Sequence, residues 1–268
     1  MAPSALLRRD TARMGPVIDA PHPWREDGAR AKAAEVVDAQ LAGIASIVRF
    51  RRGEFVCREG EPAVAMFSLA SGAVSSWLHT PEQGQQVVGF QFANDLVGFA
   101  RAGRYRTTVK AVTPLTAYRL PVEALERRLL RNPDLVFAIA CKLSDDLYAA
   151  QDHAVLISRH RAVARLALFL QRLEARAGDE RGGLREMFLP MSRTEIASYL
   201  NVSPEAVSRS FAELLRQGSI RVRERRYVMI MDHAALDALA VEPRAALEGE
   251  VGGGPPPGCD PDDAPCVL

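Results

Sequence analysis

Long apolar runs are missing from this sequence. No stretch of about 18 consecutive apolar residues occurs, which is the length that a membrane-spanning helix needs. The first 30 residues carry prolines and charges where a secretory signal peptide needs an apolar core. We therefore expect a cytoplasmic protein with no membrane partner.

Cysteine is scarce and scattered. The four cysteines are Cys57, Cys141, Cys259 and Cys266. Disulfide frameworks and structural zinc sites place cysteines at short, regular spacings that these residues do not have. The sequence therefore indicates neither, and the role of Cys259 and Cys266 stays open.

Histidine is also sparse. The five histidines form no H-x-H pair and no group, and the sequence carries no nucleophile motif. A cupin-type metal enzyme would need clustered His and Glu ligands that face one cavity. That function stands as a remote alternative. We predict a protein that is not an enzyme and that carries no metal or other cofactor.

Positive charge gathers in one part of the chain. The formal net charge is only +1. From Arg159 to Arg226, however, 14 Arg stand against 8 acidic residues, whereas from Val241 onward 6 acidic residues stand against 1 Arg. A local basic excess indicates a polyanionic partner such as DNA.

The segment from Met191 to Gly218 predicts two short helices joined by a tight turn. Ser192 and Glu195, three residues apart, form a capping-box pattern that starts a helix over Arg193–Leu200. The chain must then turn sharply at Asn201, and Asn is among the few residues other than glycine that tolerate a left-handed backbone. This is the outline of a helix-turn-helix.

A second helix starts immediately after the turn. Ser203 is placed to cap it, and Pro204 falls in its first turn, where a missing amide hydrogen costs nothing. Helical spacing predicts that the apolar residues of both helices face each other. These residues are Ile196 and Leu200 in the first helix and Val207, Phe211, Leu214 and Leu215 in the second.

The opposite face of the second helix carries Glu205, Ser208 and Arg209. Arg can donate two hydrogen bonds to guanine, Glu can accept one from cytosine, and Ser can contact several bases. Such a set suits a helix that lies in the DNA major groove. The alternative interpretation is a solvated helix face, and we favour base reading because both caps and the turn are present.

Residues Ser219 to Met231 form two short alternating runs, which predict a β-hairpin. This hairpin would be the wing of a winged helix, followed by a short helix that Asp232 caps and that ends at Ala240. Side chains that bind phosphates position a domain on DNA without reading its sequence. The candidates for this role are Ser192, Ser203, Arg221, Arg223, Arg225 and Arg226.

Composition divides the remaining chain into segments. Residues 1–30 hold four prolines, which predicts a loose arm, and a short helix follows over Ala31–Ile44. From Val48 to Leu120, runs of Val, Phe and Leu alternate with glycines, as in an antiparallel roll or barrel. We therefore predict a roll domain at 31–132, a long helix at 133–158, a DNA-binding domain at 159–240 and a disordered tail at 241–268.

The stretch from Pro133 to Ser158 has no internal Gly or Pro and predicts a helix of about seven turns. One set of its apolar residues recurs at steps of four and three, which is the seam of two helices packed side by side. This seam consists of Val136, Ala140, Leu143, Leu147, Ala150, Ala154 and Ile157. The alternative is a helix laid on its own β-domain. Because Ile139, Cys141 and Leu156 supply a second apolar face, we favour a homodimer.

A further helix is expected from Arg161 to Ala177. Its inward residues would be Val163, Leu166, Leu170 and Leu173, and it would open the DNA-binding domain. A homodimer places two recognition helices about one DNA turn apart, so the expected target is double-stranded DNA with a palindromic operator.

This domain order resembles the CRP/FNR family of bacterial transcription regulators over about residues 45–240. The segments FRRGEFVCREGEP, LASGAVSSW and DLVGF resemble the FNR branch, which includes the FixK regulators. In that branch the recognition helix carries E-x-x-S-R, which here is Glu205 to Arg209. The resemblance implies half-sites of the TTGAT type in an inverted repeat, with Arg209 on the guanine, Glu205 on the opposing cytosine and Ser208 nearby.

Two departures from the family pattern concern its ligands. Iron-sulfur members hold their cluster with N-terminal cysteines and one cysteine in the roll, but this chain has none before Cys57 and has Tyr118 at the internal position. Cyclic-nucleotide-binding members carry a Gly-Glu pair and an Arg-Ser pair. Here Asn94 and Asp95 replace the first pair, and only Arg106 with Thr107 could imitate the second.

The fold class predicted is α+β: an antiparallel β-roll of the cyclic-nucleotide-binding, double-stranded β-helix type, a central dimerisation helix and a winged helix-turn-helix. The leading function is a homodimeric, FixK-like transcription regulator that is controlled by abundance or partner contacts. RNA polymerase is the expected protein partner, and an activator is the favoured interpretation. The alternative within the family is gating by a cyclic nucleotide, a haem-bound gas or another small molecule, which would bias a two-state central helix. The sequence leaves the signal, the target genes and the choice between activation and repression open.

Overall fold

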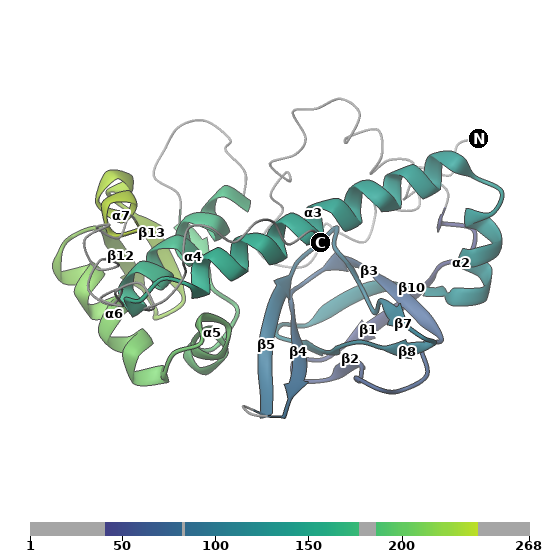
Figure 1. The fold of residues 1–268 in the computed structure, drawn as a ribbon, viewed down its shortest axis with the longest axis horizontal. Coiled ribbons are helices and arrows are strands. Elements are labelled where there is room, and N and C mark those ends of the chain that lie inside the picture. The colour runs from purple at the N-terminus through teal and green to yellow at the C-terminus, as the bar shows by residue number, and fades with distance from the viewer. Residues whose placement is uncertain (1–40, 82–83, 177–185, 241–268) are drawn as a thin grey trace, which may run out of the picture.

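The computed structural model describes residues 41–81, 84–176 and 186–240. The expected arm at 1–30, the expected tail at 241–268 with Cys259 and Cys266, and most of the helix expected from Ala31 lie outside these residues. In Figure 1 a β-domain and a helical domain lie at opposite ends of the molecule, and one long helix crosses both. The described architecture is α+β, as the sequence predicts.

The β-domain is a roll of antiparallel strands. One sheet has the order β1-β10-β3-β6 and the other β2-β9-β4-β5, and a small hairpin pairs β7 with β8. The strands are β1 Ser46–Phe50, β2 Phe55–Cys57, β3 Ala65–Ser71, β4 Val74–Thr80, β5 Gly84–Gln91, β6 Leu96–Val97, β7 Ala100–Arg101, β8 Arg104–Tyr105, β9 Thr108–Ala111 and β10 Leu115–Pro121.

Along the strands of the roll, side chains alternate between the buried interior and the surface. On β3, Ala65, Phe67 and Leu69 are buried while the residues between them are partly exposed, which is the period of two that a half-buried strand requires. The turn between β3 and β4 depends on Gly72. Its φ is +92°, and a Cβ there would lie 2.5 Å from the carbonyl oxygen of Pro114, so only glycine fits.

A short helix α2, Val122–Leu129, leads into the long helix α3, Pro133–Ile157. The Asn132 side chain caps α3 by accepting a hydrogen bond from the Leu135 amide at 3.1 Å. Leu135, Ala138 and Leu156 are buried against the rest of the same chain. The prediction of a single long helix is confirmed, with its last residue one position earlier than expected.

The C-terminal domain combines four helices with a small sheet of order β11-β13-β12. Its elements are α4 Ala162–Arg176, β11 Glu186–Phe188, α5 Arg193–Leu200, α6 Pro204–Arg216, β12 Ile220–Arg223, β13 Tyr227–Ile230 and α7 His233–Ala240. The inward residues predicted for α4 are confirmed: Val163, Leu166 and Leu170 are buried and Leu173 packs against the same core.

One apolar cluster spans the boundary between the two domains, which the sequence did not indicate, while the interior of the roll forms a cluster of its own. The Phe90 ring of β5 lies 5.2 Å from the Tyr199 ring of α5 and 6.2 Å from the Phe169 ring of α4, centroid to centroid. The backbone amide of Val87 donates a hydrogen bond to Ser198 Oγ at 2.9 Å. Helix α5 therefore docks on the outer face of β5 in the same chain.

Membrane insertion through a helix finds no support in the described part of the chain, where no helix has the length and apolar character to cross a bilayer.

Candidate nucleic-acid interface

Helix α5 begins at a complete capping box. The Glu195 amide donates to Ser192 Oγ at 3.2 Å, and the Ser192 amide donates to Glu195 Oε2 at 2.8 Å. The Ser192 hydroxyl also donates to that carboxylate at 2.8 Å. This start was predicted, and the reciprocal hydrogen bonds fix the direction in which α5 leaves the loop.

The turn after α5 is left-handed at Asn201, with φ +52° and ψ +52°. Arg165 of α4 secures it, because its Nη1 donates to the carbonyls of Leu200 and Asn201 at 2.9 Å each, while its Nε donates to the Arg159 carbonyl at 2.6 Å. Carbonyls at a helix end otherwise lack partners. Arg165 was not among the predicted site residues, and its only signal in the sequence was a charge beside the apolar face of α4.

Helix α6 starts as predicted, with Ser203 Oγ accepting a hydrogen bond from the Ala206 amide at 3.1 Å and Pro204 in the first turn. Val207, Phe211 and Leu214 are buried against the rest of the domain. Leu215 is not: its side chain is 44% exposed. The prediction that Leu215 packs on α5 is wrong, because this residue lies at the edge of the apolar face, where helical spacing alone does not decide burial.

The predicted base-reading residues Glu205, Ser208 and Arg209 are all exposed on α6. The Ser208 hydroxyl donates to the Pro204 carbonyl at 3.0 Å. The pKa of Glu205 lies below its usual value because the carboxylate accepts hydrogen bonds from its own amide and from Ser203 and faces Arg209. Among the ion pairs of the described residues none joins Glu205 to Arg209. The three side chains therefore form an accessible polar face with both charges available.

Arg193, the first residue of α5, connects the two helices and the wing. Its guanidinium stacks on the Phe211 ring of α6, 3.3 Å from the centroid, and its Nη2 donates to the Arg225 carbonyl at 3.4 Å. Burial lowers the pKa of Arg193 to about 10. Arg193 was predicted only as the first residue of a helix, although a planar cation at this place fits an aromatic face.

The predicted wing is the hairpin of β12 and β13. Glu224 and Arg225 have φ values of +52° and +59° at its tip, and the Arg226 amide donates to the Arg223 carbonyl at 3.2 Å. Two consecutive residues with positive φ are typical of a type I′ hairpin turn. Arg221 and Arg225 are exposed and Arg226 is partly exposed, so the wing presents cations beside α6.

Arg223 differs from the other wing arginines. Its guanidinium makes two hydrogen bonds to the Glu186 carboxylate, at 2.7 and 3.0 Å, and a third to Glu224 at 2.6 Å. It also lies over the Tyr227 ring, 4.3 Å from the centroid. These partners, Glu186 first, raise the pKa of Arg223. Both acids compensate the charge of Arg223. Because Glu186 belongs to β11, the pair also ties β11 to the wing.

Helix α3 carries an apolar stripe that the single chain leaves uncovered. Six of the seven predicted seam residues are exposed, namely Val136, Ala140, Leu143, Leu147, Ala150 and Ala154. The seventh, Ile157, is partly buried and packs on the apolar cluster that spans the domain boundary. The second apolar face expected from Ile139, Cys141 and Leu156 packs toward the chain itself, with Leu156 buried and the other two partly buried.

The residues that replace a cyclic-nucleotide site are engaged within the chain. Asp95, 1% exposed, binds Lys142 of α3 and Arg176 of α4 and accepts a hydrogen bond from the Phe92 amide. Arg106 pairs with Glu59 at 3.5 Å on the surface. An acid that already neutralises two internal cations is not placed to hold a ribose, so this geometry does not favour the nucleotide-gated alternative.

Two protein families match parts of this chain. Residues 47–132 match the cyclic nucleotide-binding domain, and residues 164–239 match the Crp-like helix-turn-helix domain. These ranges correspond to the β-roll with α2 and to the domain that carries α5, α6 and the wing.

Individual proteins extend the likeness across both domains. The chain is similar to electron transport regulator A of Shewanella oneidensis, with 29% identity over 73% of this chain and 79% of the relative. It is similar to the nitrogen fixation regulation protein FixK of Bradyrhizobium diazoefficiens, with 30% identity over 72% of this chain and 81% of the relative. Among solved structures, FixK2 from Bradyrhizobium japonicum superposes with a TM-score of 0.67 and 26% identity, over 75% of this chain and 99% of that one.

Proposed function

Because this chain belongs to the CRP/FNR family of transcription regulators, we propose that two copies bind an inverted repeat in DNA and that α6 of each copy reads one half-site. The protein is a FixK/FNR-like DNA-binding regulator, as its relatives are. The relatives that it matches are regulators rather than enzymes, so the cupin-type alternative is set aside.

The observation that carries the proposal is the exposed face of α6. Glu205, Ser208 and Arg209 lie within about one helical turn of one another on a helix whose other face is buried and whose start is capped. Arg209 would donate two hydrogen bonds to a guanine, Glu205 would accept one from the opposing cytosine, and Ser208 would contact a neighbouring base. Family kinship favours half-sites of the TTGAT type.

The wing and the helix N-termini would hold the DNA backbone. Arg221, Arg225 and Arg226 present their charge beside α6, and none of them has an acidic partner among the ion pairs of the described residues. Ser192 and Ser203 lie at the starts of α5 and α6, where amide groups favour phosphate. Arg223 would have to exchange Glu186 and Glu224 for a phosphate, so we assign it to holding the wing in place.

The exposed stripe of α3 supports the dimer. Apolar residues at steps of four and three along a helix pack well against a second copy of the same helix. The two-fold symmetry of such a dimer would set the two α6 helices about one DNA turn apart, which an inverted repeat matches. RNA polymerase is the partner proposed for the DNA-bound dimer, with activation as the outcome, on family kinship alone.

A binding experiment with purified full-length protein in air, without added ligand, tests this function. Fluorescence anisotropy at one fixed salt concentration would compare a duplex holding an inverted TTGAT repeat with a duplex in which each G·C pair of the half-sites is exchanged for A·T. We expect the first duplex to bind more tightly by about 1–3 kcal/mol per exchanged pair. Equal affinity for both duplexes would contradict base reading by α6. If the protein binds the duplex only after a cyclic nucleotide is added, the ligand-gated alternative is favoured.

A further inference from the structure

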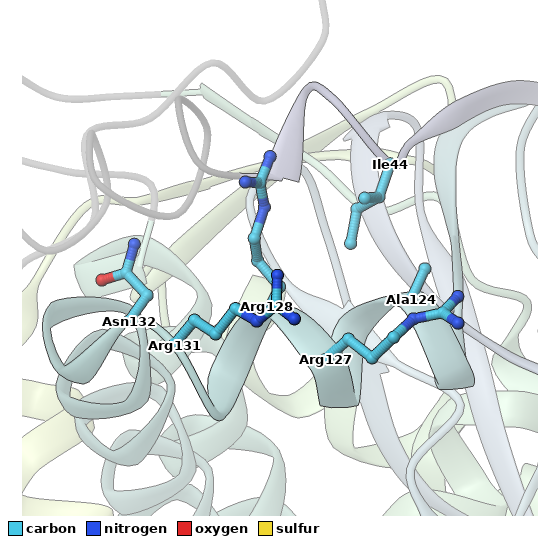
Figure 2. Close-up of a pocket in the computed structure, with 6 residues that line it drawn as sticks. All are labelled: Ile44, Ala124, Arg127, Arg128, Arg131 and Asn132. Carbon is cyan, nitrogen blue, oxygen red and sulfur yellow. The ribbon is translucent and has the colours of Figure 1, made fainter.

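A basic cavity lies beside α2, at the end of the molecule far from α6 (Figures 1 and 2). Its volume is about 380 Å³, and among the described residues no acidic side chain lines it. The lining residues are Ile44, Ala124, Arg127, Arg128, Arg131 and Asn132. Three arginine side chains therefore line one cavity that lies away from the proposed DNA-reading surface.

Within the described part of the chain, no carboxylate compensates the charges of these arginines. Across the described residues, no ion pair involves Arg127, Arg128 or Arg131, in contrast to Arg223 and Arg176, which bind acids. The Nε atom of Arg128 is buried and has no hydrogen-bond partner. Arginine cannot lose its proton in a protein, so the cavity is a site of standing positive charge with an unsatisfied donor.

The Arg128 side chain lies beside the turn before β1. In Figure 2 its side chain rises from α2 toward that turn, and a Cβ added to Gly43 would lie 3.0 Å from its Nη2. The turn itself is closed by the Ile44 amide, which donates to the Leu41 carbonyl at 3.0 Å. The absence of a side chain at Gly43 therefore leaves room for the Arg128 guanidinium beside this turn.

Asn132 adds a neutral donor to the same cavity. Its Oδ1 is committed to the Leu135 amide as the cap of α3, which leaves its Nδ2 group to donate elsewhere. Ile44 and Ala124 form the apolar part of the lining. Guanidinium groups together with an amide donor and an apolar wall match a ligand that is anionic at one end and less polar at the other.

We propose that this cavity binds a small phosphorylated molecule through a diphosphate group. Three guanidinium groups oppose the charge of a diphosphate, and guanidinium geometry suits paired phosphate oxygens. The volume falls within the range of about 300–1,000 Å³ for ligand sites. The charged part of the ligand is the recognised element, so inorganic pyrophosphate serves as the probe and a nucleoside diphosphate tests whether the apolar wall adds affinity.

Isothermal titration calorimetry on the full-length protein tests the proposal. Pyrophosphate and ADP would be titrated at one fixed ionic strength into the unaltered protein and into three variants, Arg128→Gln, Arg131→Gln and Arg101→Gln. Arg101 is an exposed arginine on β7, outside the cavity, and is the matched control for loss of one positive charge. Circular dichroism melting would confirm that each variant is folded.

We expect one site per chain, with affinity reduced about 10- to 100-fold in both Arg128→Gln and Arg131→Gln and unchanged in Arg101→Gln. A tighter Kd for ADP than for pyrophosphate would identify a nucleotide-like ligand, and an equal Kd would identify the phosphate groups as the whole of the recognised element. The proposal is overturned if neither probe binds at millimolar concentration, or if all three variants lose affinity equally, since the second outcome would mean attraction to overall charge. Binding of duplex DNA that depends on Arg131 as strongly as on Arg225 would also overturn it, by assigning the surface to nucleic acid.

Discussion

The Lys142 ammonium of α3 lies 2.7 Å from the Asp95 carboxylate of the β-roll, and Asp95 is 1% exposed. The same carboxylate binds Arg176, in the last turn of α4. Burial alone would raise the pKa of Asp95, but attraction to Arg176 and Lys142 and the hydrogen bond from the Phe92 amide lower it below its usual value. One buried charge therefore joins the roll, the long helix and the DNA-binding domain.

Removing the charge of Asp95 should destabilise the protein strongly. The change Asp95→Asn leaves Lys142 and Arg176 without their acid, and breaking a buried ion pair on one side costs about 3–5 kcal/mol. Urea unfolding at neutral pH and fixed protein concentration measures this. The control is Asp152→Asn, which removes an exposed partner 3.9 Å from Arg172 and should cost about 1 kcal/mol or less. Similar losses in both variants would contradict a special role for Asp95.

The same ion pairs should make stability depend on pH. Because the pKa of Asp95 is depressed, the stabilisation that its carboxylate provides is present above about pH 4 and is lost as the pH falls further.

Asp146 should have the opposite pH dependence. The pKa of Asp146 is raised to about 6, and burial is the largest cause of this shift. The folded state therefore holds a proton on Asp146 more tightly than the unfolded state does. The free energy of unfolding should then fall as the pH rises from about 4 to about 7. The change Asp146→Asn removes this penalty, and the variant should be more stable than the unaltered protein by about 1–3 kcal/mol at pH 8. Unfolding curves at pH 4 and pH 8 check the sign. A difference that does not shrink at pH 4 would contradict the assignment to Asp146.

Loss of the Arg209 guanidinium should relax base preference. Arg209→Ala removes two hydrogen bonds to guanine and should cost about 1–3 kcal/mol at the cognate operator. Anisotropy titrations on duplexes with each base at the guanine position report the preference. If the variant discriminates among these bases as well as the unaltered protein does, Arg209 does not read the guanine.

The wing should act on every DNA sequence alike. Arg225→Ala removes one exposed cation from the tip of the hairpin and should weaken cognate and unrelated duplexes to a similar degree. The slope of log K against log salt should become shallower by about 1. Titrations at several salt concentrations measure it. A loss confined to the cognate duplex would indicate that Arg225 contacts a base.

A charge in the α3 stripe should separate the two copies. Leu147 is 58% exposed in the single chain, so Leu147→Glu leaves each chain able to fold while placing a carboxylate in the proposed seam. Sedimentation velocity should find monomers, and operator affinity should fall. The control is Ala149→Glu, at an exposed position about 200° around the same helix, which should stay dimeric. Monomers in both variants would point to a general effect of charge on α3.

Much of the proposed DNA-binding surface could be predicted from the sequence because its determinants are local. The capping box of Ser192 and Glu195 involves residues three positions apart, and the left-handed turn needs only a residue such as Asn201 that tolerates positive φ. Ser203 and Pro204 start α6 by the same short-range chemistry. Once both helices are placed, helical spacing alone puts Glu205 and Arg209 on one face.

The helix-turn-helix, the wing and the order of the domains follow from local patterns, since caps, turns and side-chain periodicity act over a few residues. How these parts are joined follows from the packing of the folded chain. Asp95 meets Lys142 and Arg176 across 47 and 81 positions, and Val87 meets Ser198 across 111. That packing also decides that Leu215 stays exposed and that Arg165 holds the turn. Such contacts depend on which surfaces pack together, and no local pattern of residues records that choice.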